Sequence, residues 1–247
     1  MAVTIDAKDV YYAELNERIR DYIRQGENEI EITNVVGHRY IGGGINAKDV
    51  KITVRGVAGE DLAAFMEGPT IEVMNNAQDA VGNTMNDGQV IIHGLAGDVI
   101  GYGMRGGTVF IRDDVGYRVG IHMKGFRDKQ PVLVIGGCAG DFFGEYQAGG
   151  CLVLLGLTKT RKESVVGDYC GTGMHGGVMY IRGNVKDSYL GKEVKKFELT
   201  DDDIAKLKPI LKKFASIFGV TEDIFDFNNY CKIIPVSTRP YGQLYAY

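Results

Sequence analysis

Two short stretches of the chain match G-x-G-x-x-G, the glycine signature of dinucleotide-binding sites. The first runs from Gly101 to Gly106 and the second from Gly171 to Gly176. In such sites a long helix begins within the glycines, so that its N-terminus faces the pyrophosphate. Here the following residues, GTVFIRDD and GVMYIRGN, alternate like strands and show no helical pattern. The two motifs therefore do not predict a nucleotide site, and we expect no cofactor on this chain.

Carboxylates recur along the chain with a regular spacing, at Glu60, Asp79, Asp98, Asp141 and Asp187. Stacked carboxylates can serve glycoside hydrolysis or lyase chemistry. They can also form a turn column, in which each Asp accepts backbone N–H groups. We favour the turn column, because Tyr117 interrupts the row and the chain has no tryptophan to form a sugar platform. A carbohydrate-active enzyme that uses Asp79 and Asp98 is the alternative.

Histidines and cysteines show no pattern that predicts a metal or redox site. The four histidines are His38, His93, His122 and His175, and the four cysteines are Cys138, Cys151, Cys170 and Cys231. The histidines fall at different positions of the repeat described below and form no set of metal ligands. No C-x-x-C is present, so neither a metal site nor a disulfide framework is expected. We therefore predict no catalytic, cofactor-binding or metal-binding residue, and a cytoplasmic location with reduced thiols.

The composition is that of a soluble globular protein with many turns. The 247 residues are 45% hydrophobic and 24% charged, with a formal net charge of −4, which gives no reason to expect nucleic acid or an anionic membrane as a partner. No apolar run is long enough to span a bilayer, and the first residues do not resemble a signal peptide. The 35 glycines, against five prolines, indicate repeated turns.

A repeat with a base unit of 19 residues organises the chain from Ile30 to Ile181. Each repeat has two apolar residues at i and i+2, which point to one face of a short strand. The eight pairs are Ile30/Ile32, Ile52/Val54, Ile71/Val73, Val90/Ile92, Val109/Ile111, Leu133/Ile135, Leu152/Leu154 and Met179/Ile181. One unit cannot bury its apolar face alone, whereas stacked copies can, so the repeat predicts a parallel β-helix of about eight coils. We expect a right-handed winding, the usual hand of parallel crossover connections.

Other columns of the repeat predict turns and core. Two positions after each pair, only Gly, Asn or Asp occurs: Asn34, Gly56, Asn75, Gly94, Asp113, Gly137, Gly156 and Gly183. These residues tolerate a left-handed backbone, so we predict a corner with positive φ there. Four positions after each pair stand small residues such as Val36 and Ala58, which predict a tight corner in the interior of the β-helix. A methionine column (Met66, Met85, Met104, Met174), interrupted by Gln147, predicts core filling.

The ends of such a β-helix expose backbone edges and need caps. We divide the chain into an N-terminal capping helix (1–28), a parallel β-helix (29–192) and a C-terminal helical cap and tail (193–247). The first helix is predicted at 6–25 with Asp6 as its N-cap. The second is predicted at 201–218 with Thr200 as its N-cap and a kink or break at Pro209, followed by a strand near 231–236. Two polar insertions, 125–130 and 158–165, are expected to project as loops.

Three stretches, AVGNTMNDGQVIIHGLAGD, VIGYGMRGGTVFIRDD and GTGMHGGVMYIRGN, resemble the GXGXG repeat domain of glutamate synthase. The likeness covers most of residues 10–190. In that family the domain is a right-handed β-helix beside a glutamine amidotransferase domain and a barrel that carries FMN and an iron–sulfur cluster. Some prokaryotes split these parts into separate chains, and this sequence is similar to the stand-alone β-helix subunit.

The resemblance implies a non-catalytic scaffold of glutamate synthase. The family's amidotransferase uses an N-terminal cysteine, whereas the first cysteine here is Cys138. Because the chain lacks a cysteine cluster and a barrel pattern, FMN and the iron–sulfur cluster are expected on partner subunits. The expected partners are the amidotransferase and FMN/iron–sulfur subunits. They would contact the two insertions and the aromatic end near Tyr241–Tyr247. Association of the chain with copies of itself is a further alternative. A related repeat occurs in a subunit of formylmethanofuran dehydrogenase, which is the other alternative.

Overall fold

The computed structural model describes residues 2–161, 163–183, 185–221 and 223–236. In chain order the elements are β1 (Val3–Asp6), α1 (Tyr12–Arg24), β2 (Glu29–His38), β3 (Lys51–Ala58), β4 (Thr70–Val73), β5 (Gln89–Ile92), β6 (Thr108–Ile111), β7 (Val132–Ile135), β8 (Ala148–Leu154), β9 (Gly176–Arg182), β10 (Val194–Phe197), α2 (Asp201–Phe218) and β11 (Tyr230–Pro235). Short 3-10 turns lie at Asp187–Tyr189 and Phe227–Asn229.

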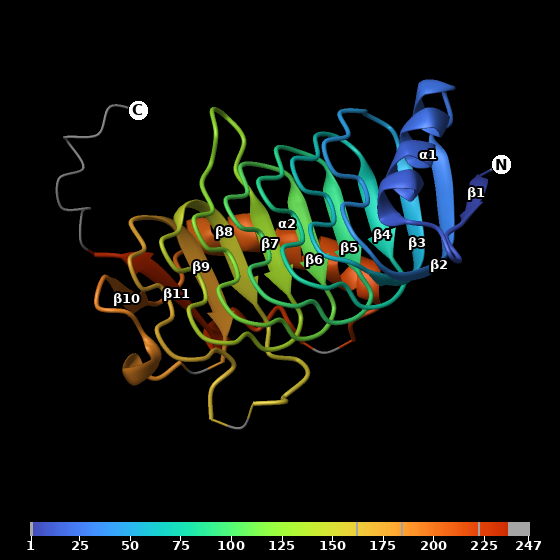
Figure 1. Ribbon diagram of the computed structural model, residues 1–247. Coiled ribbons are helices and arrows are strands. Elements are labelled where there is room, and N and C mark those ends of the chain that lie inside the picture. The colour runs from blue at the N-terminus through green and yellow to red at the C-terminus, as the bar shows by residue number, and fades with distance from the viewer. Residues whose placement is uncertain (1, 162, 184, 222, 237–247) are drawn as a thin grey trace.

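The strands form one sheet in the order β1-β2-β3-β4-β5-β6-β7-β8-β9-β11-β10. Strands β1 to β9 are parallel neighbours in chain order, and the chain winds as a parallel β-solenoid of about six turns (Figure 1). The eight predicted strands are present as β2 to β9. The expected number of eight coils was too high, because a stack of strands encloses fewer complete turns than it has strands.

The predicted apolar pairs form the inner face of the sheet. Val90 lies in register with Val109, and Ile92 with Ile111. Every member of the eight pairs is at most 1% exposed, which confirms that face. The methionine column and Gln147 are equally buried, so the prediction of core filling is also confirmed. Burial of each such aliphatic side chain stabilises the fold by about 1.5–3 kcal/mol.

Strand β2 departs from the predicted pattern at its corner. Its register with β3 shifts between Ile32 and Val35, as in a β-bulge. Asn34 has φ +57° and acts as the extra residue. Val35 is therefore buried, while Val36 is 83% exposed. The prediction that Val36 lies in the interior was wrong, because one inserted residue turns the following side chains to the other face.

Helix α2 lies across the outer face of the sheet (Figure 1). Its apolar residues Leu207, Leu211 and Phe214 form a second buried cluster with outward-facing side chains of four strands, Phe110, Val134, Val153 and Tyr180. The helix was expected to cap the end of the column. The end is instead extended by β11, which pairs antiparallel with β9, and by β10, which pairs antiparallel with β11.

The start of α2 agrees with the prediction, but its interior does not. The Thr200 hydroxyl accepts a hydrogen bond from the Asp203 amide, and the Asp203 carboxylate accepts from the Thr200 amide, which is a capping box. The helix runs without interruption through Pro209, so the predicted division is wrong. Pro209 is exposed, and water can solvate the carbonyl that the missing N–H leaves free. The buried neighbours Leu207 and Leu211 hold both halves of the helix on the sheet.

Asp203 also fastens the helix to the sheet. The Tyr180 hydroxyl on β9 donates a hydrogen bond to Asp203 Oδ1 at 2.7 Å, and Lys232 Nζ on β11 lies 2.9 Å from Oδ2. Asp203 is 4% exposed, and its carboxylate therefore joins three elements in a buried position. Burial opposes ionisation of this carboxyl, but the hydrogen bonds from Thr200, Lys232 and Tyr180 outweigh it and hold the Asp203 pKa below its usual range.

The N-terminal end is closed by a strand and a helix. Asp6 ends β1 and does not cap α1, since its carboxylate accepts hydrogen bonds from the Lys8 amide and the Asn34 side chain. The predicted helix at 6–25 is therefore shorter, Tyr12–Arg24, with Tyr11 at its N-cap position. Leu15, Asn16 and Ile19 form its buried face.

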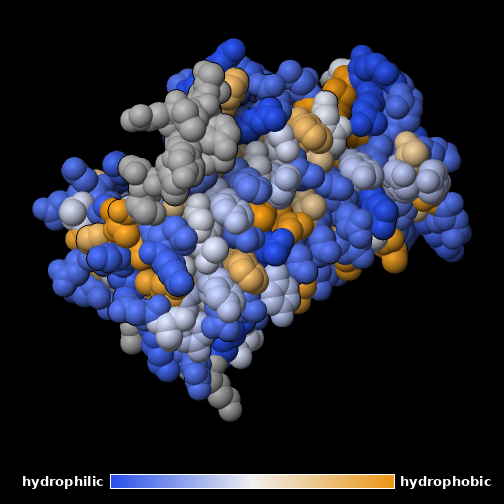
Figure 2. All heavy atoms as spheres, turned by 60° about the vertical axis from the view of Figure 1, so that its left-hand side comes forward, coloured by the Kyte–Doolittle hydropathy of each residue, from blue (hydrophilic) through white to orange (hydrophobic). Residues whose placement is uncertain are grey.

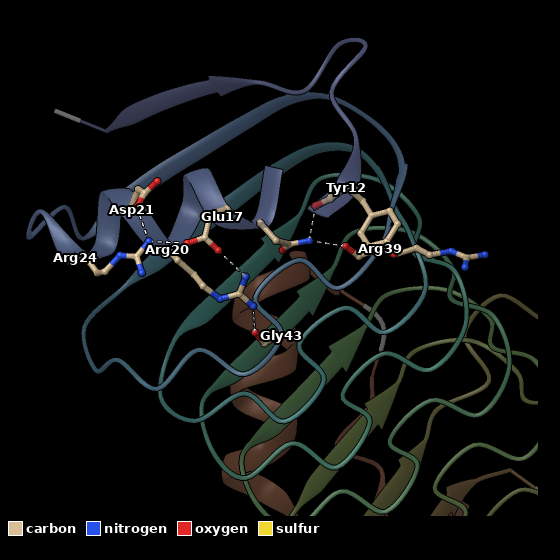
Figure 3. A network of polar contacts seen from close by, with 8 residues as sticks. Tyr12, Glu17, Arg20, Asp21, Arg24, Arg39 and Gly43 are labelled. Atoms are coloured by element: carbon tan, nitrogen blue, oxygen red, sulfur yellow. Dashed lines mark hydrogen bonds and ion pairs between the residues drawn. The ribbon is translucent and has the colours of Figure 1, made fainter. Parts of the chain in front are cut away.

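Polar contacts tie α1 to the first coil (Figure 3). Arg20 donates a hydrogen bond to the Gly43 carbonyl at 2.8 Å, and Asn16 donates to the carbonyls of Tyr12 and Arg39 at the same distance. Arg24 forms ion pairs with Glu17 and Asp21 on the exposed side of the helix. The helix thus buries its apolar face on the end of the solenoid and satisfies free carbonyls of the first coil.

Both insertions leave the column as loops, and each is tied to neighbouring coils (Figure 1). Lys129 Nζ lies 3.1 Å from a Glu67 oxygen and 2.9 Å from an Asp87 oxygen, in the two turns that precede β4 and β5. At the base of the second insertion, Thr160 donates a hydrogen bond to Asp114 at 2.8 Å. The aromatic tail near Tyr241–Tyr247 lies outside the described residues.

Candidate functional site

The glycine motifs belong to a ladder of left-handed residues on a wall of the solenoid away from the sheet. Each connection between successive strands from β2 to β9 contributes three residues with positive φ, separated by single residues. The positions are 40/42/44, 61/63/65, 80/82/84, 99/101/103, 118/120/122, 142/144/146 and 169/171/173. Glycine occupies many of them, but Val99 (φ +51°) and Tyr169 (φ +61°) show that bulkier residues are held there too. Because such residues do not adopt this conformation freely, the neighbouring coils must impose it.

Backbone hydrogen bonds of the ladder run to both neighbouring coils. Within the first motif, the Gly101 amide donates to the Val81 carbonyl of the preceding coil at 2.8 Å, and the Gly103 amide donates to the Ile121 carbonyl of the next at 2.9 Å. The amides of residues 102, 104, 105 and 106 also donate to carbonyls of the chain. A phosphate cradle needs free amides. The motif has none to offer, and β6 follows it in place of a helix.

The predicted left-handed corner is present in only half of its column. Asn34, Gly56, Gly156 and Gly183 have positive φ, whereas Asn75, Gly94, Asp113 and Gly137 do not. A Cβ added at Gly94 would lie 2.1 Å from Asn76 Oδ1, and one at Gly137 would lie 2.1 Å from Asp114 Oδ1. The prediction was wrong for these four positions. At Gly94 and Gly137, glycine is needed because a side chain of the preceding coil fills the space.

The carboxylate row is bound to the backbone of the next coil. The Asp79 side chain accepts the Asp98 amide at 2.8 Å, the Asp98 side chain accepts the Tyr117 amide at 2.8 Å, and the Asp141 side chain accepts the Asp168 amide at 3.0 Å. Glu60 instead pairs with Arg39, and Asp187 with Lys196. Asp79, Asp98 and Asp141 therefore work as the turn column that we favoured, in which each fastens one coil to the next, whereas Glu60 and Asp187 do not.

The four histidines make separate contacts, and no disulfide joins the four cysteines. His38 contacts the Val10 carbonyl, His93 contacts Glu72, and His175 contacts the Gly173 carbonyl, while His122 stacks on Tyr146. The four cysteines are free thiols, and burial raises the pKa of Cys151 to about 12. In the part of the chain that the structure describes, no group of three or more His, Cys, Asp or Glu side chains could hold a metal ion. No helix there is long and apolar enough to cross a membrane.

Aromatic side chains gather on the outside of the ladder in the later coils. Tyr102 packs edge-on against His122 (5.9 Å between ring centroids), and His122 stacks on Tyr146 (5.3 Å). Beside them, Phe142 stacks on Tyr169 at 5.0 Å. We name these five rings the ring face. Figure 2, which brings the C-terminal end of the solenoid forward, shows apolar patches within a mostly hydrophilic surface.

The middle position of each ladder triplet is glycine, or alanine at Ala63, and the family profile described as the GXGXG motif matches residues 13–236. The chain belongs to the GXGXG motif family. This is the family of the glutamate synthase C-terminal domain. An uncharacterized protein of Methanocaldococcus jannaschii is 47% identical over 251 residues, which cover 99% of this chain and 96% of that protein.

Two features of this GXGXG chain were not predicted from its sequence. The ring face was not predicted, although His122 and Tyr146 share the third position of the ladder triplet and Phe142 and Tyr169 share the first, so that rings recur in successive coils. The position of α2 was also missed, although the middle residue of each strand carries the signal. That residue is Glu31, Thr53 and Glu72 in the early strands and Phe110, Val134 and Val153 in later ones. Such a change from polar to apolar predicts an outer face that another element covers.

Proposed function

We propose that this chain is a stand-alone scaffold subunit of a split glutamate synthase. In this function it holds an amidotransferase subunit and an FMN/iron–sulfur subunit in a fixed relation, and has no catalytic residue of its own. Catalysis by separate parts requires that they be held in register, so that ammonia and electrons reach one reaction centre. We include in this proposal the right-handed winding that parallel crossover connections favour.

The observation that carries the proposal is the extent of the match with the relative. The M. jannaschii protein is aligned over 96% of its length, so a protein of this family is built almost entirely of the GXGXG domain. A second support comes from the glycine motif and the carboxylate row, the two repeated sets of residues that were candidates for a catalytic or binding site. The amides of the glycine motif donate to carbonyls of their own coil or of neighbouring coils, and Asp79, Asp98 and Asp141 each accept an amide of the next coil. Such a structure suits a spacer better than an enzyme.

Reconstitution tests the proposal. The chain would be combined with the amidotransferase and FMN/iron–sulfur subunits encoded in the same genome, and complex formation followed by size-exclusion chromatography with light scattering. We expect a complex of all three, no glutaminase or glutamate synthase activity from this chain alone, and glutamate formation that depends on its presence. Full activity when the chain is omitted would refute the scaffold role. Co-purification with formylmethanofuran dehydrogenase subunits from a native lysate would favour that alternative instead.

A matched pair of variants addresses the expected contact sites. One chain would end at Pro240, and another would carry Gly-Ser in place of residues 160–163 in the second insertion. We expect either change to weaken assembly, because the composition changes from the repeat at these points. A Gly-Ser replacement of the exposed residues 201–202, outside both segments, is the control. Unchanged assembly and activity of both variants would refute these contacts without refuting the scaffold role.

A further inference from the structure

We propose that the ring face is a docking surface for a positively charged surface of a catalytic partner subunit. The inference rests on the proposed function and adds to it which face of the solenoid is used and what chemistry the partner presents. The ring face differs from the two insertions and the tail, since it belongs to the repeat itself.

The first support is the rigidity of the exposed rings. Tyr146 and Tyr169 are 45% and 58% exposed, yet each is stacked on a neighbouring ring. Both backbones are left-handed. The Tyr146 amide donates to the Thr172 carbonyl of the next coil, and the amides on either side of Tyr169, those of Asp168 and Cys170, donate to Asp141 and to the Tyr189 carbonyl. Large rings that are already ordered lose little conformational entropy on binding, and tyrosine is enriched at the centres of protein interfaces.

The second support is an arginine held in the same surface. The Arg118 guanidinium lies 5.3 Å from the centre of the Phe142 ring and 3.4 Å, through Nε, from Glu145 Oε2. The Glu145 side chain is 9% exposed, and Oε2 has no hydrogen-bond donor within the described residues. A buried carboxylate without a donor is costly, so it attracts positive charge to this part of the ring face. Arg118, half exposed, satisfies that demand only in part.

The charge around the rings decides between possible occupants. In the ladder segments at 98–103, 117–122, 141–146 and 168–173, the carboxylates are Asp98, Asp141, Glu145 and Asp168, and the single guanidinium is Arg118. A second copy of the chain would bring acidic residues against acidic residues. A sugar would need open ring faces, whereas His122 and Tyr146 cover each other. A partner with basic side chains around an apolar centre complements both the charge and the rings.

The test measures binding of each purified partner, the amidotransferase subunit and the FMN/iron–sulfur subunit, to the full chain by calorimetry. The ring variant carries Tyr146→Asn and Tyr169→Asn, because Asn tolerates the left-handed backbone that both positions adopt. The charge variant is Asp168→Asn, whose side chain is exposed. The matched controls are Tyr11→Asn, an exposed ring at the other end of the molecule, and Asp202→Asn on α2. Thermal melts establish that all variants fold like the wild type.

We expect the ring variant to weaken binding of one partner by about tenfold or more, and the controls to change it by less than about twofold. Asp168→Asn should weaken the same complex by a smaller factor and reduce its sensitivity to salt, because it removes an attraction that ions screen. If both partners bind the ring and charge variants as tightly as the wild type, the docking surface is refuted and the scaffold role stands. If neither partner binds the wild type, the scaffold role itself fails, and this inference with it. Self-association that the ring variant abolishes would assign the surface to a second copy and overturn the proposal.

Discussion

Replacement of Gly94 by alanine should destabilise the solenoid because of crowding, not because of backbone conformation. The backbone of Gly94 is not left-handed, but a Cβ would lie 2.1 Å from Asn76 Oδ1, well inside the 3.0 Å that real Cβ atoms respect. Asn76 would have to move and would lose the hydrogen bond that its side chain accepts from the Leu95 amide at 3.0 Å. Overpacking costs about 1–3 kcal/mol and a lost hydrogen bond about 1, so we expect a loss of about 2–4 kcal/mol in the free energy of unfolding.

Urea denaturation followed by circular dichroism measures this loss, and two comparisons isolate its cause. Gly94→Asn should cost as much as Gly94→Ala or more, since left-handed tolerance gives Asn no advantage at this position. The double variant Asn76→Ala/Gly94→Ala should cost less than the two single changes added together, by about 1 kcal/mol, because removal of the Asn76 amide opens the space. Additive costs, or a Gly94→Ala variant as stable as the wild type, would refute the steric explanation.

Three further predictions concern the core, the contacts by which Asp203 holds α2 on the sheet, and the glycine motif. Ile111→Ala should lower the free energy of unfolding by about 2–5 kcal/mol, because it removes a fully buried side chain from the inner face, and a change of a few tenths in urea melts would contradict the register. The folded-state pKa of Asp203 lies below its unfolded value, so its stabilising contribution is complete above about pH 4 and is lost as the pH falls further. Asp203→Asn should therefore be less stable at neutral pH and should flatten the acid limb of a stability–pH profile, with Asp202→Asn as the control. Calorimetry with millimolar NAD, FAD or ATP should detect no binding, and saturable binding that Gly103→Val abolishes would overturn the assignment of this motif to the coil ladder.

The strands could be predicted from the sequence because one physical requirement repeats in every coil. Each inner face must bury an apolar pair against the same pair in the next coil, so Val90 and Ile92 predict Val109 and Ile111 and fix their register. The end caps could not be predicted in the same way, because each occurs once and has no column to support it. Asp6 illustrates the difficulty, since its sequence context fits a helix cap while its side chain binds Lys8 and Asn34.

The ladder could not be predicted from local preferences, because its conformation depends on contacts between coils. Val99 is a β-branched residue with φ +51°, and nothing in its immediate sequence predicts a left-handed backbone. Its amide donates to the Tyr117 carbonyl in the next coil at 2.8 Å, while the Gly101 amide donates to the preceding coil. Two neighbours therefore hold each coil in a shape that it would not adopt alone.

This mutual support has a consequence for function. A coil whose amides point alternately forward and backward cannot shift along the axis without breaking hydrogen bonds on both sides, so the ladder resists sliding and bending between coils. Side chains on its outer surface, such as Tyr146 and Tyr169, then keep fixed separations set by the coil spacing of about 4.8 Å. A surface of that kind can hold a partner at a defined height along the solenoid, because its backbone is bonded to the coils on both sides. For a subunit whose proposed task is to keep two catalytic partners in register, the rigid wall is therefore a better place for the dominant contact than the insertions.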